Sequence, residues 1–92
     1  MVSGTEIQIP ASEDVRRHME EIVREMMNLW SLSAAEAIGR VNRFWLGKTF
    51  VSTAQADVVL REEPSHWAKT IYYGPDSNWW LGENDLTPVP FP

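Results

Sequence analysis

Two stripes of apolar residues at helical spacing, separated by a link of only two or three residues, constrain the fold of this chain most strongly. The first runs along one face of residues 13–30, at Val15, Met19, Ile22, Val23, Met26 and Trp30. The second follows over residues 34–46, at Ala34, Ala37, Ile38, Val41, Phe44 and Trp45. So short a link forces two helices to cross or to fold back on each other. The sequence therefore predicts a helical hairpin in this half of the chain.

Candidate capping residues mark the ends of both helices. Ser12 and Ser33 each precede an apolar stripe and can accept a hydrogen bond from an unpaired N–H of the first turn. Glu36 completes the sequence of a capping box, in which its side chain would return to the N–H of Ser33. Gly47 supplies the left-handed residue with which helices commonly end.

A third helix is predicted over residues 53–62. Ser52 and Gln55 have the spacing of a second capping box. The alternative is a short strand at 57–60, because Val58, Val59 and Leu60 favour β structure. Such a strand would have no convincing partner except the segment at 5–9, so the helix is preferred.

Proline and glycine delimit a fourth helix, predicted over residues 64–73. Pro64 suits the first turn of a helix, and Gly74-Pro75 ends it sharply. We expect a mainly α-helical bundle of about four short helices in one domain spanning residues 1–92. Its three parts are an extended N-terminal arm (1–11), for which a frayed terminus is an equal alternative, a helical core (12–74), and an irregular, acidic, proline-rich tail (75–92).

The composition argues against several function classes. The net charge of −5 opposes non-specific binding to nucleic acid or to anionic lipid. The absence of cysteine removes disulfides, thiolate metal sites and cysteine nucleophiles. No apolar run approaches the roughly 20 residues of a membrane span, and the first residues lack the pattern of a signal peptide. We expect a cytoplasmic protein that binds neither nucleic acid nor membrane.

No residue pattern indicates catalysis, a metal or another cofactor. Glu63 and His66 match the Glu-x-x-His ligand pair of di-iron bundles, but such sites need two of these pairs. His18 has Asp14 and Glu21 on the same helical face, which solvated charge pairing explains equally well. We therefore expect a non-enzymatic protein without a cofactor.

Half of the ten aromatic residues lie in the stretch 66–80: Trp67, Tyr72, Tyr73, Trp79 and Trp80. Trp67 falls on an apolar helical face, as Trp30 and Trp45 do, so these three are expected in the core. Trp79 and Trp80 follow the end of the fourth helix. Because they are adjacent, one can pack against that helix while the other is exposed.

The predicted partner-binding residues combine these two tryptophans with nearby acids: Asp76, Trp79, Trp80, Glu83 and Asp85. Exposed aromatic residues rimmed by charge are typical of interaction surfaces. A structural clamp, in which the tail is held across the core, is the equal alternative for the tryptophans.

The first functional hypothesis is a protein-interaction or regulatory module with a basic protein partner. A specific version is an inhibitor or immunity-type protein that masks a cationic nucleic-acid-binding enzyme. The alternative is a helix-turn-helix DNA-binding regulator that reads DNA with Arg40, Asn42 and Arg43 of the second helix. The sequence does not indicate the oligomeric state.

The segments Leu32–Ala37, Phe44-Trp45, Trp67–Gly74 and Trp79-Trp80 together resemble those of small bacterial proteins of unassigned function. The resemblance covers residues 20–80 and excludes the acidic, proline-rich end. It implies a bacterial protein but no activity, so no site residue is transferred from it.

Overall fold

The computed structural model describes residues 6–75, 77, 79–82 and 86–91, and in these residues the chain is mainly helical. The mainly α-helical fold predicted from the sequence is confirmed. None of the described helices is long and apolar enough to cross a membrane. The elements in chain order are α1 (Glu13–Trp30), α2 (Ala34–Phe44), α3 (Thr53–Leu60), α4 (Pro64–Tyr73) and the short 3₁₀ helix η1 (Trp79–Leu81).

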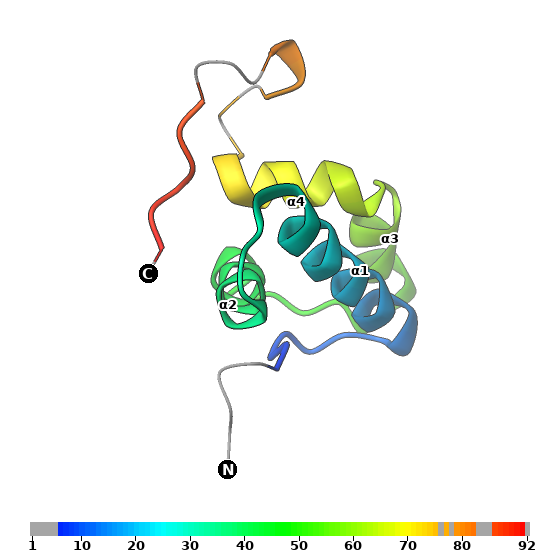
Figure 1. Cartoon of the computed structure of the whole chain (residues 1–92). Helices are drawn as coiled ribbons and strands as arrows, with labels where there is room; N and C mark the ends of the chain where they lie inside the picture. The colour runs from blue at the N-terminus through cyan, green and yellow to red at the C-terminus, as the bar shows by residue number, and fades with distance from the viewer. Residues whose placement is uncertain (1–5, 76, 78, 83–85, 92) are drawn as a thin grey trace.

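Helix α1 lies at the centre and packs against α2, α3 and α4, while α4 also contacts α2 (Figure 1). The predicted stripe of α1 points inward, because only a buried face can remove so many apolar side chains from water. The largest fully buried side chains come from α1, α2 and α3: Val15, Met19, Ile22, Met26, Val41 and Val59. Ala68 of α4 is fully buried beside them.

Helices α2 and α3 each end two residues earlier than predicted, and both ends have a visible cause. The chain leaves α2 at Trp45, whose side chain is buried in the core, and the Leu46 N–H bonds back to Arg43 in a tighter turn. After α3, Pro64 has no N–H to donate to the Leu60 carbonyl, so the helical hydrogen bonds stop there; the Glu62 carbonyl accepts from Nε2 of His18 at 2.8 Å. The helix predicted at 53–62 is confirmed over the strand.

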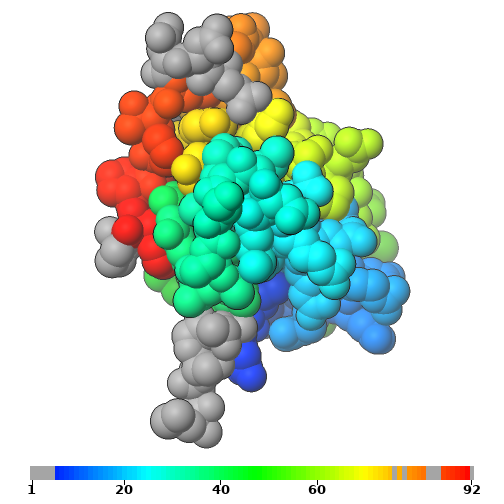
Figure 2. Space-filling view, viewed as in Figure 1, coloured from blue at the N-terminus to red at the C-terminus, as the bar shows by residue number. Residues whose placement is uncertain are grey.

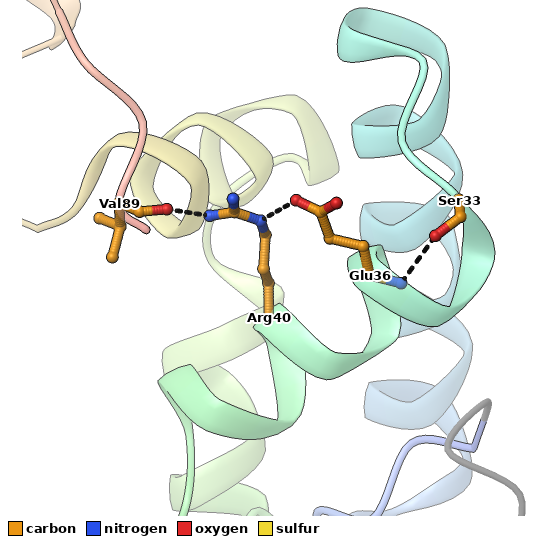
Figure 3. A network of polar contacts seen from close by, with 4 residues as sticks. All are labelled: Ser33, Glu36, Arg40 and Val89. Atoms are coloured by element: carbon orange, nitrogen blue, oxygen red, sulfur yellow. Dashed lines mark hydrogen bonds and ion pairs between the residues drawn. The ribbon is translucent and has the colours of Figure 1, made fainter. Parts of the chain in front are cut away.

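The two predicted capping boxes differ. At α3 the box is complete: Ser52 Oγ accepts from the Gln55 N–H, and the Gln55 side chain accepts from the Ser52 N–H. At α2 only the serine half forms, with Ser33 Oγ accepting from the Glu36 N–H at 3.1 Å. The predicted return of the Glu36 side chain to Ser33 is wrong, because its carboxylate accepts from Arg40 Nε at 2.9 Å (Figure 3).

Residues 6–11 form an extended arm that packs against the helices. Ile7 and Ile9 are buried, and Phe50 hydrogen-bonds to the backbone of Pro10 and Ser12 on either side of a parallel bridge with Ala11. The arm therefore contributes two side chains to the core.

Candidate functional site

Two of the five predicted partner-binding residues, Trp79 and Trp80, lie on η1, which projects from the end of α4 (Figure 1). Trp79 is partly buried and is held against α4 by its ring nitrogen. Its Nε1–H donates to Oγ1 of Thr70 at 3.1 Å, and its ring meets that of His66 edge-on at 5.1 Å. The Lys69 ammonium lies 5.2 Å from the ring centroid, within the range of a cation–π contact. Trp79 thus anchors η1 to the helical core.

Trp80 and Leu81, the next two residues of η1, are exposed. Trp80 is 57% exposed and Leu81 80% exposed, and the Trp80 ring touches only the edge of the Trp79 ring among the described aromatic contacts. The prediction that one tryptophan packs on the fourth helix while the other is exposed is confirmed. Sequence reasoning did not include Leu81, although its place beside two tryptophans in an irregular segment was a usable signal.

The three acids of the predicted site, Asp76, Glu83 and Asp85, lie outside the described residues. The structure brings Trp79 and Trp80 together, and their role in binding stays a prediction.

The residues considered for DNA reading on α2 make contacts within the chain. Asn42 uses both ends of its amide on the arm: Oδ1 accepts from the Gln8 N–H at 2.7 Å, and Nδ2 donates to the Glu6 carbonyl at 2.8 Å. Arg43 is exposed but lies over the ring of Phe91, 4.9 Å from its centroid. Helix α2 therefore does not present a row of uncommitted polar side chains to a groove.

Arg40 is the described charged residue with the least exposure, 5%. Its Nε donates to the Glu36 carboxylate at 2.9 Å, and its Nη1 donates to the Val89 carbonyl at 2.7 Å (Figure 3). The guanidinium also lies 5.0 Å from the ring centroid of Tyr72. Arg40, which the DNA-reading alternative requires at the surface, is thus a buried structural link between α2, α4 and the C-terminal segment.

The C-terminal segment 86–91 lies against α2 and the end of α4 (Figure 2). The clamp alternative expected a tail held across the core, but it assigned that contact to the tryptophans and not to this segment. The Val89 N–H donates to the carbonyl of Tyr72 at 2.8 Å. The Phe91 ring rests over Gly39 of α2, where any added side chain would meet it. One available signal was Gly39 itself, because glycine weakens a helix interior and marks a close approach there.

The histidines considered as metal ligands have other neighbours. His18 binds the Glu62 carbonyl, and His66 pairs with the Glu62 carboxylate at 3.2 Å while packing against Trp79. In the part of the chain that the structure describes, no three His, Asp or Glu side chains are grouped so that they could hold a metal ion.

Two open grooves border α1. One, of about 480 Å³, sets Arg16 and Arg24 beside Glu6 and Glu20 at the foot of the arm. The other, of about 490 Å³, lies where α1 meets the start of α4 and is lined by three glutamates, Glu21, Glu25 and Glu63, with one arginine, Arg24. Neither groove is lined by a described histidine.

Comparison of the chain with protein-family models, curated proteins and solved structures found no match. The resemblance to small bacterial proteins therefore stays a prediction, and the functional argument rests on the chain itself.

Proposed function

We propose that this protein is a non-enzymatic protein-interaction module that docks a partner through Trp80 and Leu81 of η1. The observation that carries the proposal is the contrast between neighbours. Trp79 is tied to Thr70 and His66, whereas Trp80 and Leu81 extend from the same short turn, 57% and 80% exposed. An anchored turn that holds an exposed tryptophan in place loses little conformational entropy on binding.

The same contrast supports a different role for each tryptophan, a structural clamp for Trp79 and a docking residue for Trp80. Trp79 has the contacts of a structural clamp, and its hydrogen bond to Thr70 gives the polar end of the indole a partner. Trp80 is 57% exposed, so core packing does not account for it. Tryptophan is the residue type most enriched among the side chains that dominate interface energetics.

A basic protein surface is the partner that the charge favours. The chain carries a net charge of −5, and the sequence around η1 holds three acids, Asp76, Glu83 and Asp85. Opposite charges around an apolar contact accelerate association and select against acidic competitors. The specific version, in which the chain masks a cationic nucleic-acid-binding enzyme, is part of this proposal, as are the non-enzymatic role and the cytoplasmic location.

The test compares two variants with matched exposure. A Trp80→Ala, Leu81→Ala double variant removes the proposed contact, and Leu46→Ala removes a leucine of equal exposure, 79%, on the loop after α2. Partners captured from a bacterial lysate by the wild type are purified and titrated against all three proteins. We expect at least about a tenfold loss of affinity for the double variant and none for Leu46→Ala.

Folding and salt provide the controls. Both variants should keep the wild-type far-UV circular dichroism and urea midpoint, since the changed side chains are exposed. Binding of a basic partner should weaken as salt rises from 50 to about 300 mM. Equal affinity of the double variant and the wild type for every purified partner would refute the proposal.

A further inference from the structure

The C-terminal segment is bound by the helical core in the manner of a peptide ligand. Both backbone polar groups of Val89 are hydrogen-bonded to the helices. Its N–H donates to the Tyr72 carbonyl of α4 at 2.8 Å. Its carbonyl accepts from Arg40 of α2 at 2.7 Å (Figure 3). Main-chain hydrogen bonds of this kind give affinity to an extended peptide without demanding a particular side chain.

Two glycines make room for the side chains of the segment. A Cβ atom at Gly39 would collide with the ring of Phe91, and one at Gly74 would lie 3.2 Å from Cγ2 of Val89. The guanidinium carbons of Arg40 and Arg43 lie 5.4 and 4.9 Å from the Phe91 ring centroid, within the range of cation–π contacts. The space left by Gly39, together with the cations of Arg40 and Arg43, thus forms a slot that suits an aromatic ring.

The groove is organised by contacts that do not involve the segment. The Arg40 guanidinium is oriented by the Glu36 carboxylate at 2.9 Å and lies against the Tyr72 ring. Tyr72 in turn stacks on Trp30 of α1, with ring centroids 3.8 Å apart. Because these residues have partners in the helical core, the groove keeps its shape when the segment leaves.

We propose that α2 and the end of α4 form a peptide-binding groove for an extended Val-Pro-aromatic segment, and that residues 89–91 are its resident, displaceable ligand. Thr87 and Pro90 are exposed, so the segment covers the groove without being enclosed by it. A short tether gives a segment an effective concentration in the millimolar range, so a weak intrinsic affinity is enough to keep it bound. The proposal concerns a different surface from η1 and is independent of the function proposed above.

The test supplies the segment in trans. The probe is a fluorescein-labelled, end-blocked peptide of residues 86–91, Leu-Thr-Pro-Val-Pro-Phe, titrated by fluorescence anisotropy against the full-length chain. The Phe91→Ala variant vacates the aromatic slot and should bind the peptide at least tenfold more tightly than the wild type, whose own segment competes. A peptide with alanine in place of the phenylalanine should bind at least tenfold more weakly than the probe.

A second variant identifies where the peptide binds. Gly39→Met in the Phe91→Ala background fills the slot with a good helix former and should abolish binding while preserving the circular dichroism. Failure of the folded Phe91→Ala variant to bind the peptide at 1 mM would overturn the proposal, and so would equal binding with and without Gly39→Met.

Hydrogen exchange on the wild type tests displacement without any substitution. The Val89 N–H should exchange at least tenfold faster than the amide of Met19 in α1, because the segment opens without global unfolding. An excess of unlabelled peptide should accelerate it further. Exchange of Val89 as slow as that of Met19, unchanged by the peptide, would show that the segment is a permanent part of the fold and would refute the proposal.

Discussion

Arg40 donates a 2.7 Å hydrogen bond to the carbonyl of Val89, which follows it by 49 residues in the sequence. The same guanidinium is paired with Glu36 one turn earlier, so a single buried cation joins a helix to the C-terminal segment. The side chain of Arg40 is 6% exposed and that of Glu36 is 32% exposed. Water therefore reaches the acid much more easily than the base.

Arg40→Met should lower the free energy of unfolding by about 1–3 kcal/mol. The change removes both donors and leaves the Glu36 carboxylate without its partner, although partial solvation of that carboxylate limits the cost. Urea unfolding followed by far-UV circular dichroism measures the loss. Arg17→Met is the matched control, because Arg17 belongs to an exposed pair with Glu13, and it should change stability by less than about 0.5 kcal/mol. Equal effects of the two substitutions would contradict the structural role of Arg40.

Asn42→Ala should release the N-terminal arm. The amide of Asn42 hydrogen-bonds to the backbone of Glu6 and Gln8, and the substitution leaves both backbone groups without it. We expect a loss of about 1–2 kcal/mol and faster hydrogen exchange at the Gln8 N–H. Asn28→Ala, on the exposed side of α1, is the control and should leave that exchange rate unchanged. Unchanged exchange at Gln8 in Asn42→Ala would mean that burial of Ile7 and Ile9 alone holds the arm.

Trp30 and Tyr72 should show a favourable coupling. Their rings are nearly parallel, at 11° with centroids 3.8 Å apart, and the contact joins the last turn of α1 to α4. A double-mutant cycle with Trp30→Leu and Tyr72→Leu, measured by urea unfolding, should give a coupling energy of about 1 kcal/mol. Single substitutions whose effects add within about 0.3 kcal/mol would show that the rings only fill volume.

The helices could be predicted because the signals that form them are local. The stripe from Val15 to Trp30 and the serines at positions 12, 33 and 52 act within one or two turns, and the structure uses all three serines as N-caps. The predicted end of α2 failed where a distant group intervened, because the core takes in Trp45. The end of α3 followed from a local signal that the prediction underweighted, the missing N–H of Pro64.

The contacts of the C-terminal segment could not be predicted for the same reason. Glu36 has the spacing of a capping box and also the i,i+4 spacing of an ion pair with Arg40. The ion pair forms because the buried guanidinium needs the carboxylate beside it, and that burial depends on contacts far along the chain that the local spacing does not reveal. The DNA-reading alternative had required Arg40 at the surface.

Only part of the candidate site could be predicted from the sequence. The end of α4 at Gly74 correctly separates Trp79 and Trp80 from the aromatic residues of the helix. Which of the two would be exposed depends on the reach of Trp79 Nε1 to Thr70 Oγ1, nine residues earlier, and adjacent identical residues carry no information about that.

Ser31→Gly should stabilise the protein. Ser31 ends α1 in the left-handed conformation, at φ 55° and ψ 36°, and it is the only described non-glycine residue with positive φ. Glycine adopts this conformation without the steric cost that a Cβ atom imposes, while it loses more entropy on folding. The net gain should be about 0.5–1 kcal/mol in urea unfolding, and Ser31→Val, with a β-branched side chain at the same position, should lose at least as much. In both variants the hydrogen exchange rate of the Met19 amide should change only as much as the free energy of unfolding changes, because the substitution lies at the helix end and not in the core. A destabilised Ser31→Gly would show that the serine side chain contributes more than its backbone strain costs.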